Sequence, residues 1–507
     1  MKRFTWLLAL SLCGFAQAGD FAWPPPPAPA QPLLMPAFAQ AALANGMRLV
    51  VIERRGLPLV TALLSVQAGS LLDPPGKSGL AELSFGVLGK GARRGPIKAD
   101  ASALADAADT LGSGLDISTG AQASRLVMTV MTPHLDGSLA LLADVLRAPT
   151  LPEREVASSR LQLQQTLKLA AADPAVLAHK LAWRLHWGDA PPGRLSTERS
   201  LARIRRDDVQ AFCRQHLAPE QTTLILAGDL DLAQGKRLAE RYFGGWRRTH
   251  AAPRQTRSET LLDPQGLGAR NLLVDLPGSG QSAVLLLAPY PALLPGLPGL
   301  PGLPGPANRA DLHSGALATA ILGSGYSSRI NQQVRIKRGL SYGAYSSAES
   351  LPAGGLLLLS SQTEHRNAAE VAQLLRNELL RLSSELVPAA ELLARRNGLI
   401  GDLARQMETT QSLAAMAAEQ IESGQALADL ATYEADIERV SAEQILAFAQ
   451  RYWPPQGVRS VVVGDLGLAG DSLRLQFPHA AVIQAENLDL SAGNLQRRPG
   501  QPAPGSE

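Results

Sequence analysis

Two distant segments of the chain share one pattern, and this repeat constrains how the rest can fold. Residues 203–230 read RIRRDDVQAFCRQHLAPEQTTLILAGDL, and residues 439–466 read RVSAEQILAFAQRYWPPQGVRSVVVGDL. The two align without a gap at an offset of 236 residues, and each predicts a helix, a proline-marked turn and a buried β-branched strand. VLGKG at 87–91 and ILGSG at 321–325 repeat at an offset of 234. Two matches at nearly one offset predict tandem copies of a single domain.

The chain has the length and composition for two sizeable cores. It has 507 residues, of which 45% are hydrophobic and 18% are charged. Residues 47–56 and 60–70 are β-branched and bounded by turns, which predicts strands, whereas the leucine and alanine periodicity of 99–112 and 135–148 predicts helices. This mixture predicts an α+β fold in which each copy is a mostly antiparallel sheet packed by helices.

The predicted domains span residues 39–255 and 265–475. An LPG-rich segment at 292–308 interrupts the second copy, and its proline and glycine content predicts an inserted loop because neither a helix nor a central strand tolerates that density. The composition of residues 490–507 predicts a disordered tail.

The first 18 residues have the pattern of a secretory signal. A basic start, a short apolar run and Ala-Gln-Ala predict cleavage after Ala18, and the run is too short to anchor the chain across a bilayer. The alternative, a lipid anchor at Cys13, is disfavoured by the bulky leucine before it. Residues 19–38 are proline-rich and predict an extended tether. The mature chain is therefore expected to be exported, into the periplasm of a Gram-negative bacterium, without a transmembrane span.

The net charge argues against nucleic-acid binding, and the cysteine content argues against a disulfide framework and a catalytic thiol. Cleavage removes Lys2 and Arg3, so the formal charge of +3 falls by two, and no basic block remains that would bind nucleic acid. Only Cys213 survives cleavage, which precludes an intrachain disulfide. Its helical spacing with apolar neighbours predicts a buried, inert thiol.

The order of motifs resembles a known family. VTALLSVQAGSLLDPPGKSGLAELSFGVLGKG in the first copy and LGSGYSSRINQQVRIKRGLSYGAYSSAES in the second resemble the two domains of pitrilysin- and insulinase-type zinc peptidases. The resemblance is collinear over residues 40–470. It implies two homologous domains in a clamshell-like arrangement.

Catalytic members of that family carry an inverted zinc motif, H-x-x-E-H, on a helix, where two histidines bind the metal and the glutamate activates water. Here Glu82, Phe85 and Gly86 stand at the histidine, glutamate and histidine positions. The third ligand, a glutamate, is expected near 162–166, where the sequence QLQQT has no carboxylate. No two of the eight histidines lie three or four residues apart. We therefore expect no intrinsic metal site, and zinc in a partner chain.

The second copy keeps more of the pattern. In VRIKRGLSY, Arg335 and Tyr342 match an arginine and a tyrosine that the family places opposite the zinc, where they bind the substrate backbone and the oxyanion. On spacing alone the two residues could be a surface charge and a strand aromatic. Arg338 and Tyr345 have the same spacing, but the family's form favours the first pair.

A short segment of the first copy also matches. Leu115, Asp116, Ile117, Ser118 and Thr119 resemble the family's edge strand, which pairs with an extended peptide. An ordinary edge strand of a half-buried sheet is the alternative.

The resemblance implies a non-catalytic subunit of a two-chain peptidase. A homologous partner would supply the zinc motif and hydrolyse peptides or unfolded protein, while this chain would supply Arg335 and Tyr342. The alternative is an interaction or scaffold protein with no role in proteolysis, like the family's respiratory core subunits. A third hypothesis, a peptidase with its own metal arrangement, is opposed by the missing ligands.

Overall fold

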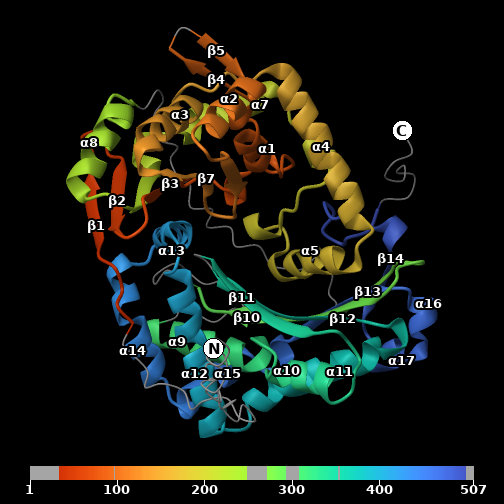
Figure 1. The fold of residues 1–507 in the computed structure, drawn as a ribbon. Helices are drawn as coiled ribbons and strands as arrows, with labels where there is room; N and C mark the ends of the chain where they lie inside the picture. The colour runs from red at the N-terminus through yellow and green to blue at the C-terminus, as the bar shows by residue number, and fades with distance from the viewer. Residues whose placement is uncertain (1–32, 96, 248–270, 293–307, 352–353, 498–507) are drawn as a thin grey trace, which may run out of the picture. The chain divides into compact units, whose positions relative to one another are not determined.

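Two six-stranded sheets organise the computed structural model, which describes residues 33–95, 97–247, 271–292, 308–351 and 354–497 (Figure 1). The first sheet has the order β1 (Phe38–Ala42), β2 (Arg48–Glu53), β8 (Thr222–Gly228), β3 (Leu59–Val66), β7 (Ser124–Met131) and β6 (Asp116–Thr119). The second sheet has the order β14 (Ala481–Gln484), β9 (Asn271–Asp275), β13 (Arg459–Gly464), β10 (Ser282–Tyr290), β12 (Gly354–Thr363) and β11 (Ala344–Leu351).

The two sheets are built in the same way from the second strand onward. β2 pairs with β8 in parallel, as β9 pairs with β13. The remaining neighbours, β8-β3-β7-β6 and β13-β10-β12-β11, are antiparallel throughout. Only the first edge differs, because β1 is antiparallel to β2 whereas β14 is parallel to β9. The predicted α+β fold with tandem homologous domains is confirmed.

Helices surround each sheet, and a small hairpin, β4 (Gly91–Arg94) with β5 (Ile97–Asp100), projects from the first half. The helices of the first half are α1 (Leu80–Gly86), α2 (Ala101–Thr110), α3 (Leu135–Arg147), α4 (Glu153–Ala171), α5 (Pro174–Trp187), α6 (Glu198–Ala202), α7 (Arg206–His216) and α8 (Leu232–Phe243). Those of the second half are α9 (Arg309–Gly323), α10 (Arg329–Asn331), α11 (Ala368–Leu382), α12 (Ala389–Gln406), α13 (Thr410–Glu422), α14 (Tyr433–Arg439), α15 (Ala442–Tyr452), α16 (Leu466–Ala469) and α17 (Asp471–Gln476).

The sequence repeat is also a structural repeat. Helices α4, α5 and α7 begin 236 residues before α12, α13 and α15, respectively. In each copy the predicted helix is followed by a short 3₁₀ turn that starts at a proline, and then by the buried strand β8 or β13. The strands predicted at 47–56 and 60–70 are β2 and β3, and the predicted helices are α2 and α3.

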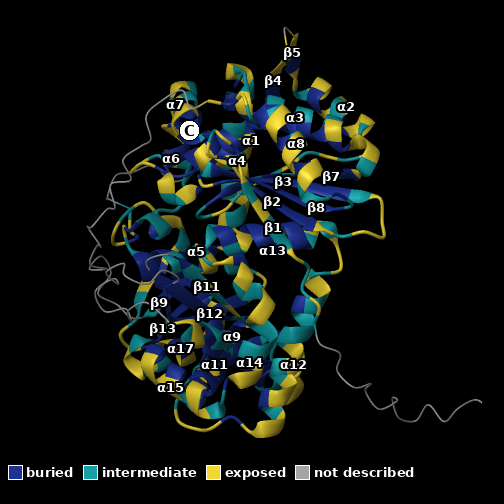
Figure 2. Ribbon diagram, turned by 90° about the vertical axis from the view of Figure 1, so that its left-hand side faces the viewer, coloured by how far each residue is buried: buried dark blue, intermediate teal, exposed yellow. Residues whose placement is uncertain are grey.

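Burial on both faces explains the apolar strands. All nine residues of β10 are buried, and they alternate between two clusters: Leu286 and Ala288 face the helices of the second half, whereas Leu285 and Leu287 face α5. A strand that is buried on both faces has no polar side to show, which is why this stretch is almost uniformly apolar. Figure 2 shows the strands mostly buried and the exposed residues mainly on helices and turns.

Each half covers the other half's sheet with one helix. Helix α5 of the first half packs on β10 and β13, and its equivalent, α13, packs on β3 and β8 (Figure 1). Both lie within the compact unit Met35–Glu507. Through α5, the first copy shares a hydrophobic cluster with the second sheet.

A charged contact reinforces the position of α13. Glu422, at its C-terminal end, accepts two hydrogen bonds from the guanidinium of Arg125 on β7, at 2.8 and 2.6 Å. The Ser65 hydroxyl on β3 donates to the same carboxylate at 2.6 Å. The side chains of Arg125 and Glu422 are only 21% and 12% exposed, so this pair is shielded from bulk water.

Some predictions concern residues that lie outside the described parts: the signal peptide and most of the tether (1–32), and most of the LPG-rich segment (293–307). The predicted disordered tail is corrected in part. Residues 490–497 are ordered because Leu495 is fully buried in the cluster around α5, which leaves 498–507 outside the described chain.

Two further predictions concern membranes and the cysteine. No helix in the described parts of the chain is long and apolar enough to cross a membrane. Cys213 is buried, and its burial raises the pKa of the thiol to about 12, which leaves the thiol protonated and unreactive.

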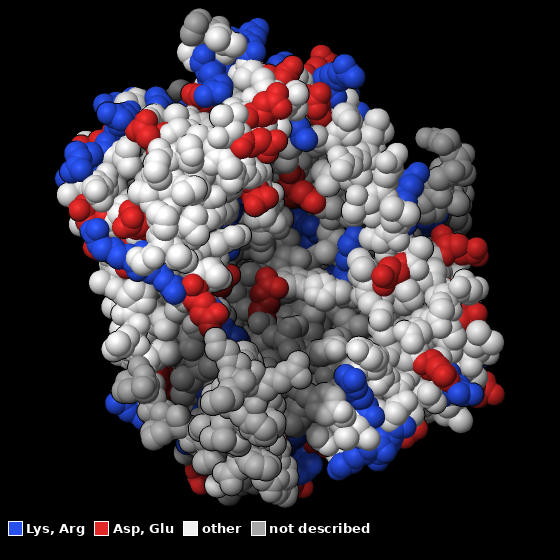
Figure 3. Space-filling view, viewed as in Figure 1, with Lys and Arg blue, Asp and Glu red and all other residues white. Residues whose placement is uncertain are grey.

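Figure 3 shows lysine and arginine interspersed with aspartate and glutamate over one face, rather than gathered into a basic block.

Candidate functional site

Packing and capping account for α1, the helix at the position of the zinc motif. It follows Gly79, whose φ of +97° is left-handed. The Asp73 carboxylate accepts hydrogen bonds from the backbone N–H groups of Gly79 and Ala81, at 2.7 and 2.8 Å. These N–H groups would otherwise have no partner at the start of the helix. The helix therefore holds its shape without a metal ligand.

The side chains of α1 divide into a packed face and an open one. Phe85, at the family's glutamate position, is 1% exposed and lies in the core of the first half. Glu82 is exposed to solvent, but partial burial of its carboxyl raises the pKa of that group. The positive charge of Lys180 on α5 acts in the opposite direction and lowers this pKa. A Cβ added at Gly86 would meet no atom within 4 Å. The open face offers one carboxylate beside empty space.

These residues do not fit the family's zinc ion. Zinc sites need three or four nitrogen, sulfur or carboxylate ligands converging on one point. Glu82 is the only such donor among the motif positions, and α4 presents amides and a hydroxyl at 162–166. Among the described residues no group of three histidine, cysteine, aspartate or glutamate side chains could hold a metal ion.

The second candidate group gathers before the edge strand β11. Arg335 lies in a π-helical turn, Gln332–Ile336, in which the Lys337 N–H donates to the Gln332 carbonyl at 3.0 Å. Turns of this kind are rare and frequently mark functional sites. The guanidinium carbon of Arg335 lies 4.5 Å from the ring centroid of Tyr342 and 5.2 Å from that of Tyr326. Both rings therefore contact the cation at cation–π distance.

The three side chains of this cluster are available to a ligand. Tyr342 is 84% exposed and Tyr326 is 63% exposed. Within the described chain, no hydrogen bond or ion pair engages the Arg335 guanidinium or either phenol. Burial cannot explain aromatic rings so exposed, and exposed aromatics that stand together are typical of binding surfaces.

The loop that carries Tyr326 is fixed by buried polar groups. The Asn331 side chain donates to the Tyr326 carbonyl at 2.7 Å and accepts from the Ala344 N–H at 3.3 Å. Arg395 donates to the Ser324 carbonyl at 2.7 Å. One amide thus links the Tyr326 loop to the first residue of β11.

The loop that carries Tyr342 is also fixed by hydrogen bonds. It turns at Gly339, whose φ is +64°. Hydroxyls of β12 then bind its backbone: Ser361 donates to the Gly343 carbonyl at 2.9 Å, and Thr363 donates to the Leu340 carbonyl at 2.6 Å. Fixed loops that present free side chains are the arrangement that binding sites require.

The structure distinguishes the two pairs of equal spacing. Arg338 forms an ion pair with Glu370 at 3.4 Å and donates to the Gln333 side chain at 2.7 Å. Tyr345 lies over Gly343, because its hydroxyl would be 2.4 Å from a Cβ added there. Arg338 and Tyr345 are thus engaged separately, whereas Arg335 and Tyr342 are in contact. The role of Arg335 and Tyr342 in binding substrate stays a prediction.

The predicted peptide-binding segment lies beside α1. Asp116–Thr119 form β6, the edge of the first sheet, which is hydrogen-bonded to β7 on one side. The side chains of Leu115 and Ile117 lie 3.9 and 3.3 Å from the Cβ position of Gly89, just after α1. An extended peptide on the open edge would therefore run past the degenerate helix.

Sequence reasoning missed Tyr326 and the amide that holds it. The available signal was an aromatic residue in the Gly/Ser-rich stretch GSGYSSR. Such a stretch predicts a surface loop, where a tyrosine side chain has no core to pack into. Asn331 carried no such signal, because its two bonds join segments that come together only in the fold.

Comparisons with known proteins identify the family of the chain. Residues 49–187 match the family model described as insulinase (peptidase family M16), and residues 203–399 match the one described as the peptidase M16 inactive domain. An uncharacterized zinc protease from Rickettsia bellii is 23% identical over 354 residues, which cover 69% of this chain and 79% of that protein.

Solved structures share the fold. A protease from Helicobacter pylori has a TM-score of 0.75 at 18% identity and covers 85% of this chain and 100% of its own. The periplasmic protease PqqL from Escherichia coli has a TM-score of 0.66 at 16% identity, covering 86% of this chain and 47% of PqqL. The two family models together match more than half of the chain. This protein therefore belongs to the insulinase family, peptidase family M16.

Proposed function

We propose that this chain is the non-catalytic subunit of a heterodimeric zinc peptidase in the periplasm. A homologous partner with an intact H-x-x-E-H motif would hold the zinc and hydrolyse the peptide bond. This chain would bind the peptide or unfolded protein substrate and present Arg335 and Tyr342 to the reacting carbonyl.

One observation carries the proposal: the chain has lost the donors of one site and keeps the side chains of the other free. Glu82, Phe85 and Gly86 cannot replace the metal ligands. By contrast, the guanidinium carbon of Arg335 lies 4.5 Å from the ring centroid of Tyr342. The polar ends of both side chains have no hydrogen bond or ion pair within the described residues. A scaffold would have no need of this exposed cluster.

The chemistry of the cluster suits peptide hydrolysis. A phenol can donate a hydrogen bond to the oxyanion of the tetrahedral intermediate, and a guanidinium offers several donors to peptide carbonyls. The open edge of β6 offers backbone groups to an extended substrate. None of these contributions requires metal on this chain.

The test mixes the purified mature chain with a homologous chain that carries H-x-x-E-H. We expect peptidase activity and bound zinc in the mixture, and neither in this chain alone. Tyr342→Phe should lower kcat/KM of the mixture by about 10²–10³-fold, the usual effect of losing one oxyanion donor. Tyr345→Phe is the matched control, since it removes a nearby phenol outside the cluster, and it should change little.

Two results would reject the proposal. Stoichiometric zinc and activity in the isolated chain would make it a self-sufficient peptidase. An inert mixture in which the two chains nevertheless associate would favour the scaffold alternative.

A further inference from the structure

A pocket of about 370 Å³ lies at the junction of three segments that are distant in sequence. Its walls come from the loop before α1 (Pro75 and Gly76), from the end of α5 and the segment that follows it, and from Leu490 and Ser491 near the C-terminus. The ordered end of the chain therefore completes this pocket, which lies apart from the Arg335 cluster.

Most of the charged residues that line the pocket are positive. Arg184, Arg194, Arg199 and Arg203 contribute to it, and Asp189 is the single carboxylate among its lining residues. We call these four arginines and their cavity the arginine pocket. Guanidinium groups that share a cavity repel one another unless an anion lies between them.

Two of the arginines have structural duties. Arg184 is 4% exposed, pairs with Asp189 and donates to the Gly188 carbonyl, so it forms the floor. Arg199 lies 3.5 Å from the carboxylate of Asp489. These contacts leave these two residues little freedom to serve a ligand.

The other two arginines keep free donors. Arg194 uses only its Nε, which donates to the backbone carbonyl of Asp189 at 2.9 Å. The Arg203 side chain has no hydrogen bond or ion pair with any residue that the structure describes. Its Nη1 lies 3.2 Å from the Cβ position of Gly76, so the absence of a side chain at that glycine leaves room for the guanidinium. Both Nη groups of Arg194 and the whole guanidinium of Arg203 thus remain available at one cavity within the described part of the chain.

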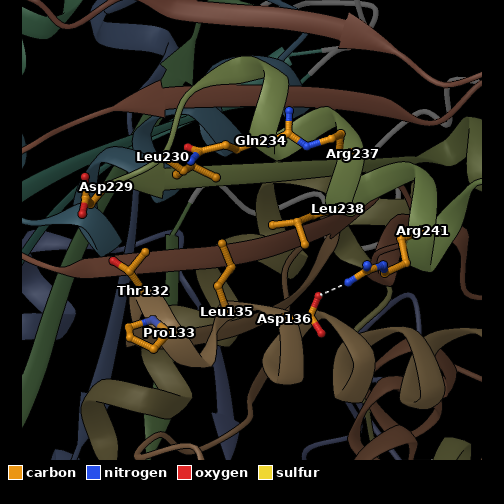
Figure 4. Close-up of a pocket in the computed structure, with 10 residues that line it drawn as sticks. All are labelled: Thr132, Pro133, Leu135, Asp136, Asp229, Leu230, Gln234, Arg237, Leu238 and Arg241. Carbon is orange, nitrogen blue, oxygen red and sulfur yellow. Dashed lines mark hydrogen bonds and ion pairs between the residues drawn. The ribbon is translucent and has the colours of Figure 1, made fainter.

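A second pocket shows that this charge is not a general property of the surface. The cavity in Figure 4 has nearly the same volume, about 360 Å³, and lies between α3 and α8. Two carboxylates, Asp136 and Asp229, balance its two arginines, and Arg241 pairs with Asp136 at 2.7 Å. The lining residues of the Figure 4 cavity are balanced in charge, whereas those of the arginine pocket carry three positive charges in excess, one of which is offset by the pairing of Arg199 with Asp489.

A second cavity adjoins the arginine pocket. This cavity shares Thr197, Arg199 and Leu490 with it and reaches Lys180, the lysine that interacts with Glu82. The two cavities therefore adjoin each other, and the second one is lined by a lysine whose charge acts on Glu82.

We propose that the arginine pocket is a binding site for a small oxyanion, a carboxylate or phosphate group, held by the guanidinium forks of Arg194 and Arg203. Planar guanidinium groups match the paired oxygens of both anions and bind them with charge-assisted hydrogen bonds. The volume admits such a group together with a short segment of the molecule that bears it. In a peptide-binding protein the carboxylate of a peptide C-terminus is one source, and free phosphate is the other.

The test is calorimetric titration of the mature chain at fixed ionic strength with three probes: inorganic phosphate, an acetylated tripeptide with a free C-terminus, and the same tripeptide as its amide. Binding of the acid but not of the amide identifies a carboxylate, and binding of phosphate identifies the second source. The double variant R194Q/R203Q should weaken the bound probe by at least about tenfold, since two charge-assisted interactions are lost. R203K, which keeps the charge and loses the fork, should fall in between.

The matched control is R237Q, which removes an arginine from the neutral cavity of Figure 4 and should leave the affinity unchanged. Arg203 and Arg237 are exposed and Arg194 is half-buried, so the substitutions should spare the fold, and thermal unfolding of each variant checks this. Absence of binding by both anions overturns the proposal. So does binding that survives R194Q/R203Q, or that R237Q weakens equally.

Discussion

Helix α1 and the segment 326–345 show opposite relations between packing and chemistry. In α1 the residues at the motif positions are explained by the fold, since Phe85 fills the core and Asp73 caps the helix. In 326–345 the framework is explained by the fold, but its exposed rings are not: Tyr326 and Tyr342 bury little surface and stack on Arg335. The difference shows that packing accounts for the residues at the motif positions of α1, whereas it leaves the exposed rings of 326–345 without a structural explanation.

The largest expected effect tests the packed side of this comparison. Phe85→Ala should lower the free energy of unfolding by about 3–5 kcal/mol, because it leaves a cavity at a site that is 1% exposed. Chemical denaturation measures the loss. The folded variant should keep the activity of the mixture with the partner, since Phe85 has no share in the chemistry. A selective loss of activity at unchanged stability would show that α1 still serves catalysis.

Burial of a histidine on α5 predicts that the free energy of unfolding decreases at acidic pH. Burial, and secondarily the positive charge of Arg459, lowers the pKa of His186 to about 3, from about 6.5 in the unfolded chain. The unfolded chain therefore takes up a proton below pH 6.5 that the folded chain refuses. The stabilisation is complete above pH 6.5 and falls as the pH drops, by about 3 kcal/mol at pH 4.5.

Denaturation of the wild type and of His186→Gln at pH 7.5 and 4.5 measures this contribution. The wild type should lose about 3 kcal/mol more than the variant on acidification, since the other titrating groups are common to both. His479→Gln, at an exposed histidine, is the control and should behave as the wild type. Equal acid losses in the wild type and His186→Gln would mean that His186 takes up its proton in the folded state.

Much of the fold could be predicted from the sequence because its signals are local or periodic. The offset of 236 residues is enough to predict the equivalence of α7 with α15 and of β8 with β13. The exchange of α5 and α13 between the sheets could not be predicted, because an apolar helix face does not specify which sheet it covers. The order of residues 490–497 was missed for a similar reason: a polar composition concealed Leu495, whose burial depends on a distant helix.

The candidate site was predictable only in part. Arg335 and Tyr342 were found through their motif, but the π-helical turn that presents Arg335 leaves no mark in composition or periodicity. The arginine pocket was invisible as well, since its lining combines residues 75–76, 184–203 and 490–491. Sites assembled from distant segments become apparent only once the chain has folded.

A smaller effect tests the framework of the exposed side. Asn331→Ala removes the amide that joins the Tyr326 carbonyl to the Ala344 N–H and leaves both groups without this partner. Unsatisfied buried groups cost about 1–3 kcal/mol, so thermal unfolding should detect the change, and the activity of the mixture should fall further than stability alone explains. Asn377→Ala, at an exposed asparagine, should do neither. Full activity in Asn331→Ala would mean that the Tyr326 loop needs no fixed position.

The smallest expected effect separates the two rings. Tyr326→Leu removes one of the two faces on which Arg335 lies, and an exposed cation–π contact is worth about 0.5–1 kcal/mol. In the mixture with the zinc-bearing partner this should raise KM by about two- to fivefold and leave kcat nearly unchanged, because in the proposed function Tyr342 supplies the oxyanion donor while Tyr326 only positions the guanidinium. Tyr326→Phe keeps the ring face and should restore the wild-type KM. If Tyr326→Phe were as impaired as Tyr326→Leu, the phenol hydroxyl would be the functional group, and the exposed side of the molecule would hold two donors in place of one.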